Sequence, residues 1–128
     1  MEISKNLVRY GATTFNLNDI VAITYHPLGE AILIVYPNER SMTLKSCEKD
    51  FKRLCELIGN CSQYTFVYSE HTMFKIEGLM CVLTCIVKKA VDLYIKYLNG
   101  DKIYLDFLTE EEVESILTAP ELNIIEEL

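Results

Sequence analysis

The sequence predicts an α+β fold built from two tandem β-rich repeats of antiparallel strands, each followed by one amphipathic helix. Short segments rich in β-branched and aromatic residues alternate with turn residues, as is typical of strands. The same order of strands and helix occurs twice along the chain. The chain has 128 residues, half of them hydrophobic, so it can bury a core without metal ions or disulfides. We expect a first repeat over residues 1–62 and a second over residues 63–128, packed as one compact unit.

The repeat is visible in aligned hydrophobic positions at a spacing of about 60 residues. Phe15 aligns with Phe74, Tyr36 with Tyr97, and Leu44 with Leu105. A chance alignment within an ordinary α+β chain is the alternative.

Ten strands are expected, five in each repeat. Their ranges are 6–10, 13–17, 20–25, 31–36, 40–44, 64–68, 72–76, 79–87, 91–98 and 102–107. Segments 31–36 and 79–87 are apolar without alternation, which is typical of strands covered on both faces, here by the other repeat or by another chain. Asn99-Gly100 predicts a type I′ hairpin turn, because both residue types tolerate a positive φ.

The first helix is expected over residues 47–58. Its apolar residues fall on one helical stripe. These residues are Cys47, Phe51, Leu54, Cys55 and Ile58. Ser46 is the expected N-cap, and Gly59 is expected to end the helix as the C′ residue.

The second helix is expected over residues 110–118. Thr109 and Glu112 have the spacing of a capping box, and Leu108 can pack on Val113 as a hydrophobic staple. Pro120 is expected to stop this helix.

The net charge of −7 lies in the second half of the chain, because the first 64 residues are net neutral. No Lys or Arg follows Lys102. We therefore expect an uncompensated anionic surface over the second helix and tail. The candidate partner-binding carboxylates on it are Asp106, Glu110, Glu111, Glu114 and Glu121.

Two interpretations of this anionic surface are open. The carboxylates start a helix and keep the protein soluble, which requires no partner. Alternatively, they dock on a basic surface, such as one that normally holds nucleic acid. Direct binding of nucleic acid is not expected, because it requires clustered Lys and Arg.

No pattern in the sequence indicates catalysis, a cofactor or a metal. The two histidines, His26 and His71, lie in turns with no local nucleophile signature. Cys55 and Cys61 lack the paired spacing of a zinc site, although a histidine could complete one in space. Glycine-rich phosphate loops and calcium loops are also absent from the sequence.

The expected compartment is the cytoplasm of a cell or of a host cell. The first residues do not form a secretory signal, and the longest apolar stretch is too short to cross a bilayer as a helix. The five cysteines are an odd number, which favours reduced thiols over a disulfide framework.

Two segments resemble the small flagellar and swarming-motility proteins of the FlbD type. Residues 92–105 followed by 110–116 are similar to the end of those proteins, and residues 15–23 are similar to their beginning. The resemblance implies a compact β-rich unit with a packed helix. It carries over no functional residue and no motility role, and two fused copies depart from the single-copy pattern.

The leading functional hypothesis is a non-enzymatic protein-interaction or regulatory module that occupies a partner's surface, with a homodimer as one form. Tyr94 and Tyr97 join the carboxylates as candidate contacts, because tyrosine is enriched at interfaces. One alternative is an acidic nucleic-acid mimic from a phage or mobile element, acting on a basic groove such as that of a CRISPR effector. A small-ligand domain or enzyme is the third hypothesis.

Overall fold

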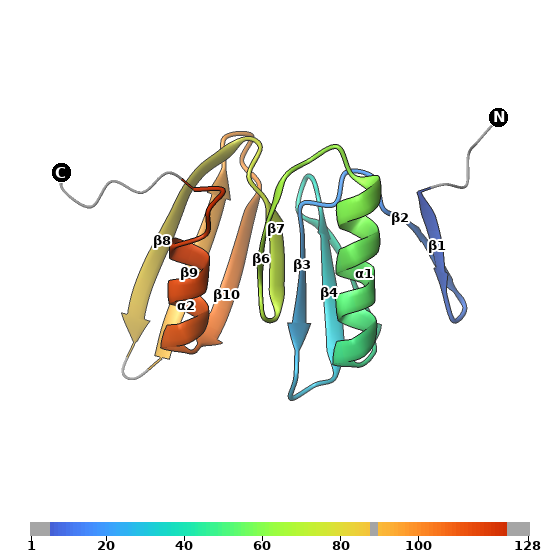
Figure 1. Cartoon of the computed structure of the whole chain (residues 1–128), viewed down its shortest axis with the longest axis horizontal. Coiled ribbons are helices and arrows are strands. Elements are labelled where there is room, and N and C mark those ends of the chain that lie inside the picture. The colour runs from blue at the N-terminus through green and yellow to red at the C-terminus, as the bar shows by residue number, and fades with distance from the viewer. Residues whose placement is uncertain (1–5, 88–89, 123–128) are drawn as a thin grey trace.

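The computed structural model describes residues 6–87 and 90–122, which form an α+β fold of antiparallel sheets and two helices (Figure 1). Each half of the chain contributes a hairpin, then a three-stranded meander, then a helix. The elements are β1 Leu7–Tyr10, β2 Thr13–Asn16, β3 Ala22–His26, β4 Ala31–Tyr36, β5 Arg40–Lys45, α1 Glu48–Cys61, β6 Phe66–Ser69, β7 Thr72–Lys75, β8 Leu79–Val87, β9 Ala90–Tyr97, β10 Lys102–Leu108 and α2 Glu110–Leu117.

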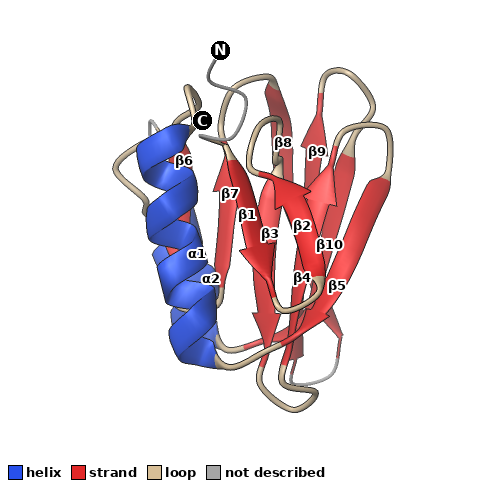
Figure 2. Cartoon of the chain, turned by 90° about the vertical axis from the view of Figure 1, so that its right-hand side faces the viewer, coloured by secondary structure: helices blue, strands red, loops and turns tan. Residues whose placement is uncertain are grey.

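The strands form a five-stranded sheet of order β5-β4-β3-β7-β6, a three-stranded sheet of order β10-β9-β8, and the β1–β2 hairpin. Both helices lie on the same side of the strands (Figure 2). The β1–β2 hairpin and β8 lie at opposite ends of the molecule (Figure 1).

The two halves are joined by the pairing of β7 with β3. Ala22 pairs with Phe74 and Thr24 with Thr72. Backbone hydrogen bonds extend the ladder at both ends, from Lys75 N to Val21 O at 2.9 Å and from Tyr25 N to His71 O at 2.8 Å. A hairpin from the second half is therefore part of the sheet built by the first half.

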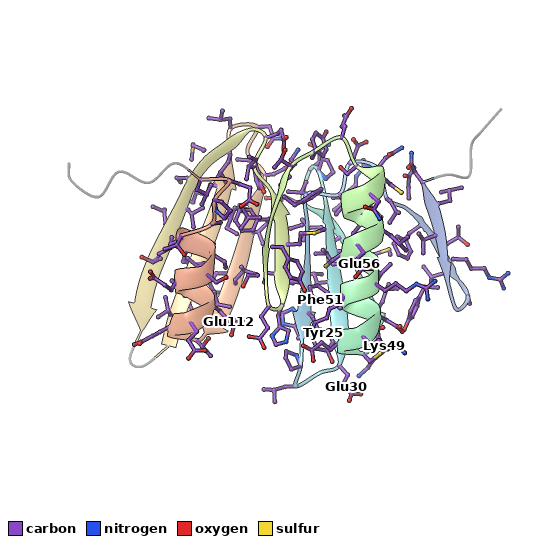
Figure 3. All side chains as sticks on the ribbon, in the orientation of Figure 1. Tyr25, Glu30, Lys49, Phe51, Glu56 and Glu112 are labelled. Carbon is purple, nitrogen blue, oxygen red and sulfur yellow. The ribbon has the colours of Figure 1, made fainter. Side chains whose placement is uncertain are left out.

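Two hydrophobic cores lie on opposite faces of this joint. Ile23 on β3 belongs to the first core, with Phe51 and Ile58 of α1. Figure 3 labels Phe51 of α1 and Tyr25 of β3, whose ring centroids are 5.8 Å apart. Phe74 on β7 belongs to the second core, together with α2 and the three-stranded sheet. Alternation along β3 and β7 lets one sheet serve both cores.

The two meanders also share their strand register. In the first meander β4 pairs with β5, and in the second β9 pairs with β10, through buried or partly buried apolar residues at corresponding positions. The corresponding pairs are Ile32↔Leu44 with Leu93↔Leu105, and Ile34↔Met42 with Ile95↔Ile103.

A tyrosine hydrogen bond recurs at corresponding positions. The hydroxyl of Tyr36 donates to Asn16 O at 2.7 Å, and the hydroxyl of Tyr97 donates to Lys75 O at 2.6 Å. In each half, this bond ties the last residue of a central meander strand to the last residue of the preceding hairpin.

Three local predictions were wrong, the first at the start of α1. The N-cap is Cys47, which makes no side-chain capping bond. The Ser46 hydroxyl is instead hydrogen-bonded to the Tyr10 hydroxyl at 2.5 Å. Tyr10 also donates to Asp50, so Ser46 helps to hold the β1–β2 hairpin against α1.

The other two errors concern glycines. Gly59 does not end α1, which continues to Cys61 and is capped by Ser62 N donating to Ile58 O. The Asn99-Gly100 hairpin is not a type I′ turn, because only Gly100 has a positive φ, of 99°. The bonds from Gly100 N to Tyr97 O and from Tyr97 N to Asp101 O are typical of a type I turn followed by a glycine bulge.

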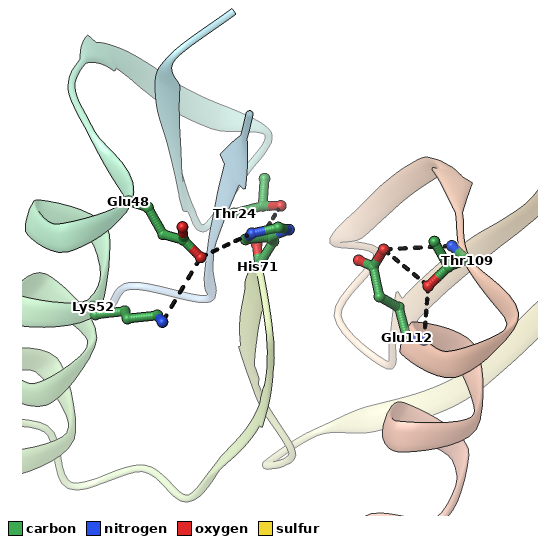
Figure 4. A network of polar contacts seen from close by, with 6 residues as sticks. All are labelled: Thr24, Glu48, Lys52, His71, Thr109 and Glu112. Atoms are coloured by element: carbon green, nitrogen blue, oxygen red, sulfur yellow. Dashed lines mark hydrogen bonds and ion pairs between the residues drawn. The ribbon is translucent and has the colours of Figure 1, made fainter. Parts of the chain in front are cut away.

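The capping box of α2 is confirmed. Glu112 N donates to the Thr109 hydroxyl at 3.1 Å, and Thr109 N donates to the Glu112 carboxylate at 3.4 Å (Figure 4). Leu108 and Val113 both pack in the second core, as a hydrophobic staple requires.

The position of Phe74 makes it a test of the joint between the halves. Phe74→Ala is expected to lower the free energy of unfolding by about 3–5 kcal/mol, because the ring is completely buried. Urea denaturation measures this change. Tyr68→Ala on the neighbouring strand β6 is the control, since Tyr68 is 47% exposed. Equal effects of the two substitutions would contradict the assignment of Phe74 to the core.

Candidate functional site

The predicted partner-binding carboxylates lie on β10, on α2 and just after α2. Each of them is exposed, and among the described residues none of them makes an ion pair. They are Asp106, Glu110, Glu111, Glu114 and Glu121. Glu112, between them in sequence, is occupied by the capping box. The described part of the anionic surface is therefore electrostatically uncompensated.

The two predicted tyrosines lie in different environments. Tyr94 is 39% exposed, whereas Tyr97 is only 3% exposed. Tyr97 packs in the second core, so the prediction that it contacts a partner is corrected. Strand alternation should have placed Tyr94 and Tyr97 on opposite faces, because their positions differ by three, an odd number.

An exposed tyrosine pair lies on the face of the three-stranded sheet opposite the second core. Tyr94 and Tyr104 are directly paired across β9 and β10, with ring centroids 4.8 Å apart. Tyr104 is 51% exposed. Its hydroxyl donates to Asp92 Oδ2 at 2.8 Å, and this bond, with burial and the charge of Asp92, raises the pKa of Tyr104 to about 12.

The tyrosine pair forms one wall of a cavity of about 570 Å³ between the two sheets, which we call the tyrosine groove. The opposite wall comes from Leu33 and Val35 of β4. The groove is therefore apolar on both sides. Its lining residues are Leu33, Val35, Glu39, Arg40, Ser41, Tyr94, Lys96, Lys102, Ile103 and Tyr104.

One rim of the tyrosine groove carries charge. Arg40, Lys96 and Lys102 line it together with a single carboxylate, that of Glu39. Lys102 Nζ lies 3.8 Å from Glu39 Oε1. The rim thus keeps a net positive charge beside an apolar groove.

Tyr104 and the β4 wall were missed by the sequence reasoning. The alternation of residues 102–107 could have indicated that Tyr104 is exposed, because it places Tyr104 on the face opposite the buried Ile103 and Leu105. No sequence signal indicated that β4 would face Tyr94 across a groove, because that contact depends on how the two sheets pack.

His71 lies in a second region, near the start of α1. His71 Nε2 lies 3.2 Å from Glu48 Oε1, and Lys52 Nζ lies 3.7 Å from the same carboxylate oxygen (Figure 4). Thr24 Oγ1 donates to His71 O at 3.0 Å. This network ties α1 to the β6–β7 turn.

Glu48, Glu70 and His71 are the one group of three metal-ligating side chains found in the described part of the chain, with ligand atoms within 4.8 Å of one another. His26 and His71 also line a cavity of about 320 Å³. The carboxylate of Glu48 already contacts both His71 and Lys52, which accounts for the cluster as a structural network.

In residues 6–87 and 90–122, no hydrogen bond joins a cysteine to a histidine. Cys55 is buried in the first core, and burial raises the pKa of its thiol to about 12. A thiol with so high a pKa is protonated and unreactive near neutral pH. Cys47, Cys61 and Cys85 are exposed, and Cys81 is half-buried.

Comparisons with known proteins find no family model that matches the chain, and no similar curated protein or solved structure. Neither helix in residues 6–87 and 90–122 has the length and apolar character that crossing a membrane requires. Function must therefore be inferred from the geometry of the chain itself.

The hydrogen bond between Tyr104 and Asp92 can be tested by titration. Asp92→Asn removes the acceptor charge and is expected to lower the pKa of Tyr104 from about 12 towards the ordinary value of 10.0. NMR of the labelled tyrosine ring carbons measures this, and Tyr104→Phe identifies the resonance. An unchanged pKa in Asp92→Asn would contradict the assigned cause.

Tyr97 should make stability depend on alkaline pH. Burial, with the nearby charge of Asp101, raises the pKa of Tyr97 far above its ordinary value of 10.0. Below pH 10 the hydroxyl keeps its proton in the folded and unfolded states alike. Above about pH 10 only the unfolded chain releases that proton, so the free energy of unfolding is expected to fall as pH rises.

Urea denaturation between neutral pH and pH 11 measures this fall, and Tyr97→Phe is the matched variant. The variant should be less stable at neutral pH, because it loses the bond to Lys75 O, but its stability should decline less above pH 10. If the free energy of unfolding declined equally in both proteins above pH 10, Tyr97 would be ruled out as a cause of the decline.

Proposed function

We propose that this chain is a non-enzymatic protein-binding module that acts by occupying a partner's surface, with the tyrosine groove as its contact site. The observation that carries the proposal is the exposed Tyr94–Tyr104 pair on an apolar groove of about 570 Å³. Exposed aromatic side chains beside an apolar hollow are typical of interface anchors.

The groove suits a protruding segment of a partner protein better than it suits a flat partner surface. The tilted rings of Tyr94 and Tyr104 already contact each other, and Tyr104 is held by its hydrogen bond to Asp92. Their ordered rings cost little conformational entropy on binding. Leu33 and Val35 offer a partner side chain a second apolar wall.

The rim charges define the chemistry of the segment. Arg40 and Lys96 favour carboxylates on the partner. We therefore propose that the groove takes a segment with an apolar side chain flanked by Asp or Glu.

Selection from a peptide-phage library on immobilised protein tests this proposal. Wild-type protein is expected to enrich peptides with an apolar residue beside acidic ones. Tyr104→Ala is expected to weaken the binding of the enriched peptides by about tenfold or more, as the loss of an interface anchor does. Tyr68→Ala is the matched control, because Tyr68 is comparably exposed on β6.

Peptides that bind Tyr104→Ala and wild type equally would contradict the groove as the contact site. Loss of binding in both tyrosine variants would point to general destabilisation, which the unfolding transition of each variant detects.

A second candidate is supported by the uncompensated carboxylates on α2. An acidic ridge of this kind can dock on a basic protein surface and mimic nucleic acid there. In the same selection, this function predicts Lys- and Arg-rich peptides whose binding weakens at high salt. Replacing Glu111, Glu114 and Glu121 by Lys should abolish their binding and leave the fold intact, since all three are exposed.

A further inference from the structure

Strand β8 lies at the edge of its sheet although its sequence is that of a central strand. It has nine residues, Leu79–Val87, with neither a charge nor a proline. Natural edge strands are normally short or protected by charge, proline or a bulge. Met80 is 54% exposed and Leu83 is 47% exposed. The only irregularity in its pairing is a register shift between Leu79 and Cys81.

The corresponding strand in the first half is β3, which is covered. Ile23 pairs with Ile34 on β4, and Val82 pairs with Ile95 on β9, at the positions that correspond between the two meanders. Thr24, which corresponds to Leu83, is only 5% exposed. The difference is that β7 pairs with β3, whereas β8 lacks a second neighbour among the described strands.

The β1–β2 hairpin of the first half corresponds to the β6–β7 hairpin of the second half. Unlike β7, β2 has an outer edge that pairs with no other described strand. The β1–β2 hairpin has the register of the β6–β7 hairpin, with Val8↔Phe15 corresponding to Val67↔Phe74. β7 uses its outer edge to pair with β3. In the described chain β2 pairs only with β1.

The backbone amides of β2 that face away from β1 are placed as pairing with a further strand requires. Leu17 N donates to Asn6 O, so alternate residues of β2 face β1, and the amides of Thr14 and Asn16 face away from it. Their counterparts in β7 are Met73 and Lys75. Lys75 N donates to Val21 O in the pairing with β3. The same groups are thus available on β2 as are used on β7.

We infer that the chain consists of two copies of one unit, and we propose that β2 of one molecule pairs with β8 of a second copy of the chain. The pairing would repeat the β3–β7 ladder between molecules. Phe15 would lie beside Cys81 of the second copy, Thr14 beside its Val82, and Thr13 beside its Leu83.

The β2 and β8 strands of one molecule cannot pair with each other, because they lie at opposite ends of the molecule (Figure 1). The same contact can, however, repeat from one molecule to the next. The contact is head-to-tail, since two different edges meet. Such contacts produce closed rings or open filaments. This inference does not depend on the tyrosine groove as a binding site, because the groove's Tyr104 lies on β10, two strands from the β8 edge.

Proline variants of the two edges test the proposal. Thr14→Pro removes the outward amide of β2, and Thr84→Pro removes the amide of β8 that corresponds to Tyr25 N, the donor to His71 O. Arg9→Pro is the matched control. Arg9 pairs directly with Thr14, but its backbone amide faces the outer edge of β1. Proline at this position therefore perturbs the same hairpin without blocking the outer edge of β2.

Light scattering after gel filtration gives the result. Wild type and Arg9→Pro should exceed the 14.7 kDa mass of one chain, increasingly so with concentration, whereas each of Thr14→Pro and Thr84→Pro alone should remain at one chain mass. Mixing these two variants should restore a species of two chains, because one retains β8 and the other retains β2. This complementation also shows that both variants are folded.

Three outcomes would overturn the proposal. Wild type could remain at one chain mass up to about 1 mM, where even a weak contact is populated. Thr14→Pro could still associate while Thr84→Pro does not, which would indicate β8–β8 pairing. The mixed variants could fail to associate while circular dichroism shows both folded. Tyr104→Ala should associate like wild type, which separates this proposal from the groove.

Discussion

The pairing of β7 with β3 is the constraint on which the rest of the structure depends. It inserts a hairpin of the second half into the sheet of the first half. Because side chains alternate along a strand, one face of this joint supplies Ile23 and Met73 to the first core and the other supplies Ala22 and Phe74 to the second. A shift of one residue in this register would turn each apolar set towards the wrong core.

The same joint determines which surfaces remain open. By covering β3, it makes the first meander part of a five-stranded sheet, while the second meander keeps three strands and an uncovered edge. It also sets the two sheets so that Leu33 and Val35 face Tyr94 and Tyr104 across the tyrosine groove. The groove and the β8 edge therefore follow from one asymmetry between otherwise corresponding halves.

The polar interactions mainly position these elements. Tyr36 and Tyr97 each donate to the last carbonyl of a hairpin, and the Tyr10 hydroxyl joins the first hairpin to α1 through Ser46 and Asp50. The carboxylates of α2 differ, because none of the exposed ones in the described residues is used in an ion pair. They remain a charged surface on the side of the three-stranded sheet where α2 packs, whereas the tyrosine groove lies on the opposite side.

The sequence by itself determined the strands, both helices and the capping box of α2, because these depend on local periodicity and on neighbouring residues. Local reasoning was wrong at Ser46, whose hydroxyl is hydrogen-bonded to Tyr10, and at Gly59, beyond which α1 continues to Cys61. Only the tertiary structure decided that Tyr97 is buried, that β4 faces the tyrosine pair, and that β8 is left at an edge. These features depend on contacts between residues far apart in the chain, whose energies no local pattern encodes.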